Sequence, residues 1–592
     1  MRAAALALLL SACSSVPTED QVGLRLIGGQ AALPTEVTAL RFDLFYENQG
    51  DTTRLTIGDS LPDMPEFAAP ALLTDLPTGI PILVRVLGSN GEREWIGHVG
   101  PVVLGPGERF YGDLRLYEVG TSTAVEPDGF ARRFLHTATG LPDGRVLIAG
   151  GFTSATRAES CPAQAPTGAT ACFELQASRQ GVLFDPNTSQ LHEVDGGMGE
   201  ARAGHTATLV DGRVLIAGGA PRAVLALVPG NGDGTVLRPE FVPLTAPDEV
   251  GAHSSFELFD PVLGFDEEDP DRNGDPTAGE FIGSAGDPGI VGQLNDPRFM
   301  HAAALAPDGN RVLLVGGVVA DESFEVFDVG RAGGYGVYDN GGAALDSPRA
   351  HPSAVAGADS VWIFGGARAS NNSDLAEIWD PGDTGNGAVR GAGDTSYPGE
   401  MPSDDTPRPE LAAQRPVVGA LNGGTHGVTS SWFGPNCRPG ETTPSFATSD
   451  TCNESGGPGR SYVTDLSSGL TSVIDLELRA FGASAELRDF GLNPFRNDFE
   501  GPAPVVFSGG AANGGLIASQ SVEVIAGDTT DGSTAAIRDA QLRTARFFHT
   551  STAMPHRGLL TFGGIQLIGG DQVVLLDSVE VHYLDSPPAP NQ

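Results

Sequence analysis

Lysine is absent from this 592-residue sequence, so all 35 basic side chains are arginines, and 75 acidic residues bring the formal net charge to −40. A protein that captures DNA or RNA through its surface charge needs a basic stripe, because phosphates repel a strongly acidic surface. We therefore expect no nucleic-acid partner and no broad electrostatic attraction to anionic lipid headgroups.

Long apolar runs are also missing after the first dozen residues, so no later segment is expected to span a membrane. Residues 1–12 carry one positive charge at Arg2, then a short apolar run and small residues, which is the layout of a secretory signal. Segment 10–13, Leu-Ser-Ala-Cys, resembles a bacterial lipobox. The resemblance implies cleavage before Cys13, acylation of its thiol and a polar tether over 13–20.

The lipobox resemblance predicts a protein anchored by lipid in the bacterial cell envelope, at the outer membrane, facing the periplasm or the exterior. Ordinary secretion with a chance cysteine is the alternative.

Cysteine is scarce, and the five cysteines minus Cys13 leave an even set of four. Cys161 and Cys172 are near neighbours in loop-like sequence, and so are Cys437 and Cys452, as expected for two local disulfides in an oxidising compartment. A zinc site is the competing idea, but the two-residue Cys spacing and nearby histidines that zinc sites use are missing.

Glycine and proline, at 81 and 44 residues, are too frequent for long helices and favour many short strands joined by tight turns. Over residues 21–118 apolar residues alternate as they do in strands, for example at Leu40, Phe42 and Leu44. Evenly spaced short strands over about a hundred residues predict a β-sandwich-like domain.

One pattern recurs beyond residue 120, and it is clearest at 202–219. There Arg-Ala-Gly-His opens an apolar strand, Asp211-Gly212 turns the chain, and a second apolar strand ends in a glycine pair. Asp-Gly between two apolar runs predicts a tight β-hairpin, and the glycine pair lets the chain leave the second strand without a Cβ clash. The seven copies are 133–151, 202–219, 298–317, 349–366, 415–434, 479–510 and 546–564.

A third strand with its own signature follows most copies, as in Phe-Glu-Leu-Phe-Asp at 256–260 and Phe-Glu-Val-Phe-Asp at 324–328. Four antiparallel strands per repeat, with Gly-Gly ending the second, resemble the kelch repeat. The resemblance covers about residues 121–585 and implies a seven-bladed kelch-type β-propeller over 119–586, similar to the central domain of galactose oxidases. The copies at 415–434 and 479–510 are degenerate, which leaves six blades open.

The seventh copy has no clear fourth strand before the C-terminal tail at 587–592. Residues near 116–125 are expected to supply that strand, which would join the two ends of the repeat region and remove an exposed sheet edge. An ordinary linker is the alternative.

Histidine occupies the third position after the arginine in four copies, at His136, His205, His301 and His549. Because each lies at the same place in a repeated strand, we interpret them as hydrogen-bonding groups between blades rather than as a ring of metal ligands. No set of copper ligands or catalytic residues can be assigned from the sequence.

One loop matches the spacing of a calcium-binding loop, with oxygen donors at positions one, three, five, seven and twelve. Calcium is therefore the candidate cofactor, although chance turns of this kind are common in so acidic a chain. Its candidate ligands are Asp269, Asp271, Asn273, Asp275 and Glu280.

Insertions after the second strand, at 152–180, 220–254 and 435–460, are expected to crowd one face of the propeller. A rigid scaffold with variable loops on one face favours a non-enzymatic binding or scaffold protein for a glycan, peptide or protein ligand. The alternative is a carbohydrate-active enzyme of the galactose oxidase or sugar-epimerase type.

The arginine that opens each copy would lie in a ring on the same face as the insertions. Guanidinium groups form bidentate hydrogen bonds with carboxylate, sulfate or phosphate, so this ring predicts a site for an anionic glycan or peptide. The alternative is that each arginine pairs with an acidic side chain or carbonyl of its own or the adjacent blade. The residues are Arg133, Arg202, Arg298, Arg349, Arg415, Arg479 and Arg546.

Overall fold

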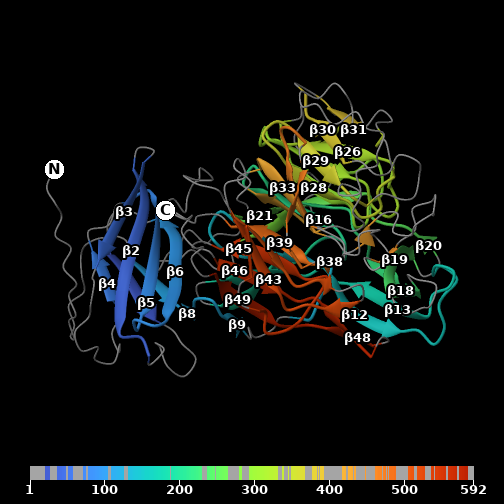
Figure 1. Ribbon diagram of the computed structural model, residues 1–592. Helices are drawn as coiled ribbons and strands as arrows, with labels where there is room; N and C mark the ends of the chain where they lie inside the picture. The colour runs from blue at the N-terminus through green and yellow to red at the C-terminus, as the bar shows by residue number, and fades with distance from the viewer. Residues whose placement is uncertain are drawn as a thin grey trace.

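Figure 1 shows the computed structural model of the chain, in which β-strands are the regular elements. The described residues are 21–584 except 27–35, 49–50, 58–70, 75–77, 104–108, 126–130, 187–188, 230–236, 247–248, 264–278, 283–291, 331–335, 339–343, 346–347, 367–375, 383–384, 386, 392–416, 422–423, 431–432, 435–446, 449–460, 470, 475, 478, 488–503, 513–515, 527–534, 539–540, 555–557 and 570–571. Among these residues there is no helix, and hence none that is long and apolar enough to cross a membrane. The prediction of an all-β chain is confirmed.

The strands before residue 119 form two sheets. The larger contains, in spatial order, β3 (Asp51–Ile57), β2 (Ala39–Asn48), β5 (Pro81–Ser89), β6 (Glu94–Val103) and β8 (Tyr117–Glu118). The smaller contains β4 (Ala71–Thr74), β1 (Gln21–Leu26) and β7 (Arg109–Leu114). Alternation along β2 buries Leu40, Phe42 and Leu44 on one face, while the buried carboxylate of Asp43 on the other accepts hydrogen bonds from Arg85.

Seven antiparallel sheets follow in the described part of the chain, numbered here by their first strands; six have four strands and sheet 2 has five. Sheet 1 contains β10 (Thr137–Gly140), β11 (Val146–Ala149), β14 (Gly181–Asp185) and β15 (Gln190–Glu193), and sheet 2 contains β16 (Thr206–Val210), β17 (Arg213–Ala217), β21 (Ser255–Asp260) and β22 (Glu280–Ile282), with β23 (Gly292–Gln293) beside β21. Sheet 3 contains β24 (Ala302–Leu305), β25 (Arg311–Val315), β26 (Phe324–Asp328) and β27 (Gly336–Val337). Sheet 4 contains β28 (Ser353–Ala356), β29 (Val361–Phe364), β30 (Glu377–Asp380) and β31 (Ala388–Gly391). Sheet 5 contains β32 (Val417–Leu421), β33 (His426–Ser430), β36 (Ser461–Asp465) and β37 (Thr471–Ile474). Sheet 6 contains β39 (Ala483–Glu486), β40 (Val505–Ser508), β43 (Val522–Ala526) and β44 (Ala535–Arg538). Sheet 7 contains β45 (Thr550–Met554), β46 (Gly558–Phe562), β49 (Val579–Tyr583) and β9 (Ser122–Val125).

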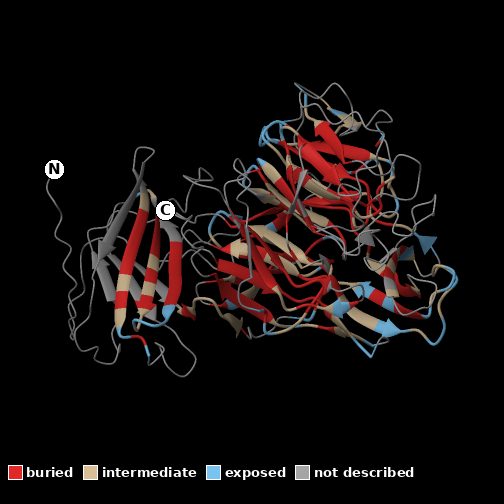
Figure 2. Cartoon of the chain, viewed as in Figure 1, coloured by how far each residue is buried: buried red, intermediate tan, exposed pale blue. Residues whose placement is uncertain are grey.

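Consecutive sheets pack against each other through both faces. The first strand of each sheet contacts the first strand of the next, and β45 of sheet 7 contacts β10 of sheet 1. In β11, Val146 and Ile148 pack toward sheet 7, whereas Leu147 and Ala149 pack toward sheet 2. Because both faces are covered, most second strands, such as β11 and β29, are continuous apolar runs rather than alternating ones, and Figure 2 shows them buried.

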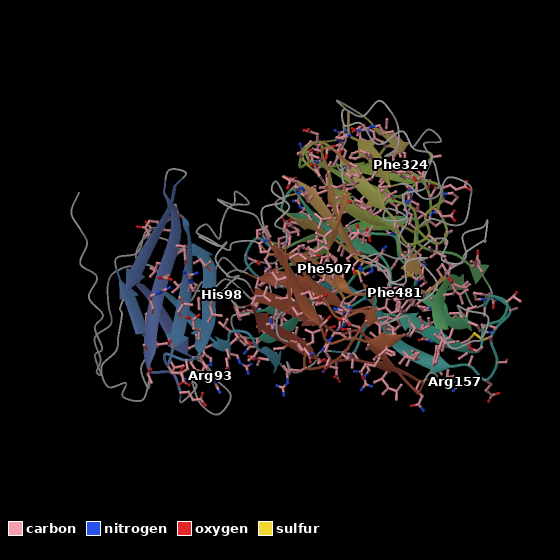
Figure 3. The ribbon with its side chains drawn as sticks, in the orientation of Figure 1. Arg93, His98, Arg157, Phe324, Phe481 and Phe507 are labelled. Carbon is pink, nitrogen blue, oxygen red and sulfur yellow. A yellow bond between two sulfur atoms is a disulfide. The ribbon has the colours of Figure 1, made fainter. Side chains whose placement is uncertain are left out.

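The fourth strand of sheet 7 comes from the start of the repeat region, because β9 pairs antiparallel with β49. The sequence prediction that residues near 116–125 supply this strand is confirmed. The N-terminal sheets contact the same place: the His98 ring bonds the Tyr583 hydroxyl at 2.9 Å, and the Tyr117 and Tyr583 rings lie 5.8 Å apart. Figure 3 shows His98 on the side of its sheets that faces sheet 7.

The insertions after the second strands of sheets 1 and 2 join into one further sheet, named here the lid sheet. It contains, in spatial order, β12 (Phe152–Arg157), β13 (Ala171–Ala177), β18 (Arg222–Pro229), β19 (Leu237–Ala246) and β20 (Glu249–Val250). Isolated bridges join Phe134 to Phe152 and Ala203 to Ala220, beside the starts of the first strands. The prediction that 152–180 and 220–254 lie on one face is therefore confirmed, whereas 435–460 lies mostly outside the described residues.

Shorter insertions add three small sheets. They are β34 (Phe433–Gly434) with β35 (Ala447–Thr448); β38 (Arg479–Ala480), β41 (Ala511–Ala512) and β42 (Ile517–Ala518); and β47 (Ile565–Ile568) with β48 (Gln572–Leu575). Strand β48 contacts β12 and β42 contacts β47, so the insertions of sheets 6 and 7 extend the lid sheet around the same face.

Cys161 and Cys172 form a disulfide, as the cysteine spacing predicts. Cys172 lies on the outer face of the lid sheet, where Val224 and Ala226 pack against the loop that carries Cys161. The bond thus holds that loop over the apolar outer face of the sheet. Cys437 and Cys452, like Cys13, lie outside the described residues.

Candidate functional site

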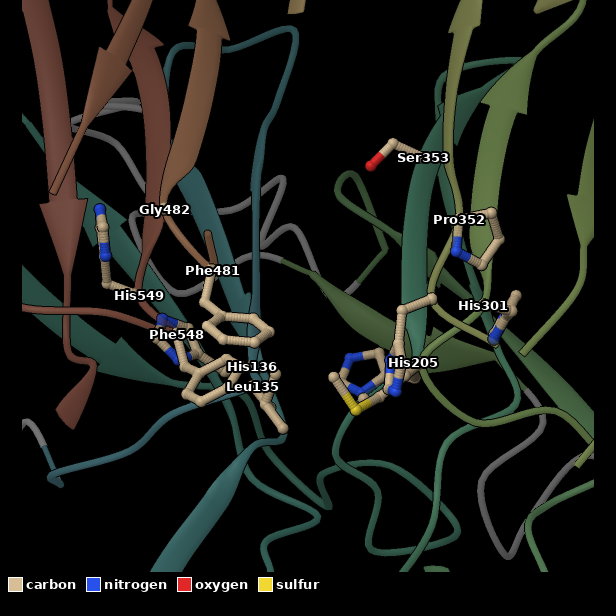
Figure 4. Close-up of a pocket in the computed structure, with 13 residues that line it drawn as sticks. Leu135, His136, His205, His301, Pro352, Ser353, Phe481, Gly482, Phe548 and His549 are labelled. Atoms are coloured by element: carbon tan, nitrogen blue, oxygen red, sulfur yellow. The ribbon is translucent and has the colours of Figure 1, made fainter. Parts of the chain in front are cut away.

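A pocket of about 340 Å³ lies where the first strands of six of the seven sheets begin. Its lining comes from the second to fourth residues after the arginine that opens each repeat. Figure 4 shows the imidazoles and phenyl rings of sheets 1, 6 and 7 across the pocket from the residues of sheets 2, 3 and 4. The lining residues are Leu135, His136, Gly204, His205, Met300, His301, His351, Pro352, Ser353, Phe481, Gly482, Phe548 and His549.

The second residue after the arginine has a left-handed backbone in five of these sheets. The φ angles are 50° at Leu135, 61° at Gly204, 54° at Met300, 58° at Phe481 and 55° at Phe548. Large L residues rarely adopt this conformation, since it brings Cβ close to the following carbonyl oxygen. Strain of this kind persists only where the surrounding structure enforces it.

Backbone hydrogen bonds between sheets enforce it here. The Phe548 amide donates to the Phe481 carbonyl at 2.8 Å, and the Leu135 amide donates to the Phe548 carbonyl at 3.2 Å. The Gly204 amide donates to the Leu135 carbonyl at 2.9 Å, and the Met300 amide donates to the Gly204 carbonyl at 2.7 Å. We call these five residues the collar. The collar was not predicted from the sequence, where its only trace is that glycine or an apolar residue occupies this repeat position in most copies.

The repeated histidines bridge adjacent sheets, as the sequence predicts. Each imidazole Nε2 shares a hydrogen bond with a hydroxyl of the preceding sheet in the cycle. The pairs are His136 with Thr550 at 2.8 Å, His205 with Thr137 at 3.0 Å, His301 with Thr206 at 2.9 Å and His549 with Ser508 at 3.1 Å. In the described part of the chain, no three His, Cys, Asp or Glu side chains are arranged to hold a metal ion.

The glycine pair that ends the second strand in every sheet except sheet 5 makes room for these contacts. A Cβ at Gly218 would lie 2.6 Å from the Arg298 carbonyl oxygen and 2.9 Å from Cε1 of His301. The next glycine, Gly219, donates its amide to the same carbonyl at 2.7 Å. Both glycines have positive φ, so a side chain would be strained as well as crowded.

Three of the imidazoles that line the pocket, those of His136, His205 and His301, are held neutral. Burial, followed by the charge of Arg202, lowers the pKa of His205 to about 3. Burial and the adjacent arginines Arg133 and Arg298 also lower the pKa values of His136 and His301 well below the ordinary value. At neutral pH these three side chains therefore contribute hydrogen-bonding capacity and no charge.

Stability should consequently fall on mild acidification. Below about pH 6.5 the unfolded chain binds protons at His136, His205 and His301, whereas the folded chain leaves His205 neutral down to about pH 3. Unfolding is favoured as pH falls through this window, by up to about 1.4 kcal/mol per pH unit for each histidine. Guanidinium chloride midpoints at pH 7.5 and 5.0 measure the loss. His205→Asn should reduce the slope, and equal midpoints in the parent protein would contradict the prediction.

The arginine that precedes each histidine lies behind the pocket wall. Arg298 is fully buried and donates Nε to Oε1 of Glu325 at 2.8 Å. Its Nη1 donates to the carbonyls of Gly316 and Ser323, both at 3.0 Å, and its Nη2 donates to the Ser323 hydroxyl at 2.9 Å. All three nitrogens are therefore used within sheet 3.

Three other arginines are buried in the same way against the third-strand glutamate of their own sheet. The pairs are Arg202 with Glu257, Arg349 with Glu377 and Arg546 with Glu580. Sheet 1 differs, because Val182 stands where the other sheets have this glutamate, and Arg133 donates to the Gln180 side chain and the Gly150 carbonyl. The pairing role of these third-strand glutamates was not predicted from the sequence, although glutamate recurs in the third-strand pattern, as at 256–260 and 324–328.

The geometry of these five arginines matches the pairing alternative. A ligand would have to displace carboxylate or carbonyl partners to reach Arg133, Arg202, Arg298, Arg349 or Arg546, so direct ligand binding by them stays a prediction. Arg415 and the side chain of Arg479 lie outside the described residues. So do Asp269, Asp271, Asn273 and Asp275 of the predicted calcium loop, whereas its last member, Glu280, begins β22.

A second set of arginines links sheets on the opposite face, at the hairpins. In sheet 1, Arg145 donates to Asp143 of its own turn and to the Pro261 carbonyl of sheet 2 at 3.0 Å. In sheet 3, Arg311 donates to Asp308 of its own turn and to the Pro381 carbonyl, which follows β30 of sheet 4. Arginines therefore fasten both ends of the repeat unit.

No protein-family description and no curated protein sequence matches the chain. Two similar solved structures are a fungal alcohol oxidase of the AA5 family in complex with copper and the protein YjhT. The oxidase is 13% identical, with 78% of this chain and 76% of that chain covered and a TM-score of 0.46. YjhT is 11% identical, with 77% and 99% covered and a TM-score of 0.33. Likenesses this distant leave the site to be argued from its own residues.

Proposed function

We propose that this chain is a non-enzymatic binding protein of the bacterial cell envelope, whose sheets 1 to 7 form a seven-bladed kelch-type β-propeller. The contacts that run from β10 through each first strand to β45 and back to β10 support a closed ring. The seven apolar clusters between consecutive sheets support it too. The N-terminal β-sandwich-like domain would separate the ring from the membrane.

The observation that carries the binding role is the pocket inside the collar. Six sheets contribute to its lining, so it exists only when the ring is assembled, and backbone hydrogen bonds across sheets hold its shape. Binding sites are typically preformed concavities with apolar walls and a few placed polar groups, and the collar with Ser353 and the imidazoles has this character. We propose that one small ligand, or one side chain of a larger glycan or peptide, occupies this pocket.

A pocket-filling substitution tests this function. Glycan, peptide and small-molecule libraries would be screened against the full chain by thermal shift, and each hit measured by isothermal titration. Ser353→Trp should weaken binding at least tenfold, about 1.4 kcal/mol, because the indole occupies the ligand volume. Ser467→Trp, at an exposed turn of sheet 5, is the control. Equal affinity in the Ser353→Trp protein would place the ligand elsewhere and overturn the proposal.

The anchor is the second part of the proposal, and it is supported by the sequence of residues 1–13. In cells, Cys13→Ser should leave an unprocessed precursor and prevent acylation. The protein should then no longer partition into the detergent phase with acylated lipoproteins. Metabolic labelling with an alkynyl fatty acid measures this directly. Labelling of the Cys13→Ser chain equal to that of the parent would refute the anchor without affecting the pocket.

A further inference from the structure

We infer that the pocket selects an uncharged, largely apolar ligand, and that the collar side chains Leu135, Met300, Phe481 and Phe548 set this selectivity. The inference rests on the proposed binding function and names the class of ligand for that same pocket. It does not assign the ligand to the buried arginines.

The first observation is that the fold requires a left-handed backbone at the collar but not a large side chain there. Of the six non-glycine residues with positive φ in the described part of the chain, four belong to the collar, and the others are Ser189 and Asp211. Gly204 holds the same place in sheet 2 and makes the same hydrogen bonds to both neighbours. Glycine therefore satisfies the collar without strain, so the large side chains in the other sheets need a further reason.

The second observation is what these side chains share. The Phe481 and Phe548 rings lie 4.5 Å apart, and Phe548 packs edge-on against Phe241 of the lid sheet at 5.3 Å. Leu135 and Met300 are partly buried against the same apolar cluster. The collar side chains thus form the apolar part of the pocket lining, and the lid sheet packs against Phe548 from behind.

The third observation is charge. The lining of the pocket includes no aspartate, glutamate or arginine, and burial keeps the imidazoles of His136, His205 and His301 neutral. Behind the wall, Arg298 and Arg546 pair with buried glutamates, and Arg133 donates to the Gln180 side chain and the Gly150 carbonyl, so an anionic ligand would have to displace these partners to reach a guanidinium group. An ionised ligand would lose its hydration here without gaining an opposite charge, whereas an apolar ligand would gain from contact with the collar.

Two fluorescent probes with the same ring system test the class of ligand. N-Phenyl-1-naphthylamine is neutral, and 8-anilino-1-naphthalenesulfonate adds a sulfonate to the same skeleton. Titrated into the full chain, the neutral probe should bind at one site with at least tenfold higher affinity than the sulfonate. Equal or tighter binding of the sulfonate, or no saturable binding of the neutral probe, would overturn the inference.

Ser353→Trp separates this inference from the proposed function. Neutral-probe binding that Ser353→Trp abolishes supports both. If the sulfonate binds at least as tightly as the neutral probe and Ser353→Trp abolishes its binding, the pocket remains the site and only the apolar selectivity is rejected. Probe binding that Ser353→Trp leaves unchanged would mean that the pocket is not the site, which rejects both.

Glycine substitutions test the role of the collar side chains. The Leu135→Gly/Met300→Gly protein should lose little melting temperature, because relief of the positive φ offsets part of the apolar contacts that are lost, while its affinity for the neutral probe falls at least tenfold. Asp211→Gly relieves a φ of 50° at an exposed hairpin turn and should leave probe binding unchanged. Unchanged probe affinity in the double variant would assign these side chains to the fold instead.

A charge substitution keeps the test decisive if the glycine protein unfolds. Met300→Arg retains a long side chain at the wall and should invert the preference, so that the sulfonate binds at least tenfold more tightly than the neutral probe. An unchanged order of affinities in a folded Met300→Arg protein would show that Met300 does not face the ligand and would overturn the assignment.

Discussion

Replacing Arg298 with leucine should lower the free energy of unfolding by about 3–5 kcal/mol, because it leaves the Glu325 carboxylate buried without its ionic partner. The amides of Asn295 and Asp296 would still donate to Glu325, but the carbonyls of Gly316 and Ser323 would lose their donors. Guanidinium chloride unfolding, followed by tryptophan fluorescence at pH 7.5, measures the loss.

Two further variants separate the buried pair from surface charge. Arg93→Leu removes the ion pairs of a 53% exposed arginine with Glu36 and Glu118, which are 57% and 32% exposed, and it should change stability by less than about 1 kcal/mol. In the Arg298→Leu/Glu325→Leu protein no buried charge is left alone, so much of the lost stability should return. A loss below about 1 kcal/mol in Arg298→Leu itself would show that this arginine is not a fastener of sheet 3.

The hairpins were predictable because their signals are local. Asp211-Gly212 lies between two apolar runs, and both residues have the positive φ that a tight two-residue turn needs. The continuous apolar run at 146–149 was equally readable, since a strand packed on both faces has no polar side. Signals of this kind depend on neighbours within a few residues, which a single sequence displays directly.

The lid sheet and the collar could not be predicted in the same way. Strand β13 pairs with β18 from the insertion of the next sheet, a partnership between two variable segments that follow no repeat. The collar depends on amide and carbonyl groups of residues such as Gly204 and Met300, which are far apart in the chain and meet only when the sheets assemble. Backbone hydrogen bonds between sheets leave almost no trace in side-chain identity.

The arginines lie between these two cases, because their positions were found but their surroundings were not. The repeat pattern placed them at the start of each first strand, and it left ligand binding and internal pairing as alternatives. The Glu257 and Glu325 side chains that pair with them occupy the second position of the third-strand signature. A repeat position that is acidic in most copies, opposite one that is basic in all of them, was the available signal for the pairing alternative.

Removing the closing strand should destabilise the protein most of all. In a chain shortened to begin at residue 131, β49 would lose its pairing with β9, and the buried contacts of Tyr117 and Val125 would be lost. We expect a decrease of about 3–6 kcal/mol in the free energy of unfolding, from two large buried side chains and one edge of backbone hydrogen bonds. The exposed edge of β49 should also promote association of chains, which size-exclusion chromatography detects.

A chain shortened to begin at residue 115 is the matched control, because it lacks nearly all of the N-terminal sheets but keeps β8 and β9. It would lose the hydrogen bond between His98 and Tyr583 and the contact of Ile96 with Tyr117, yet sheet 7 would retain its fourth strand. Its unfolding midpoint should therefore lie well above that of the chain from 131. Equal midpoints for the two shortened chains would mean that the stability of sheet 7 does not depend on β9.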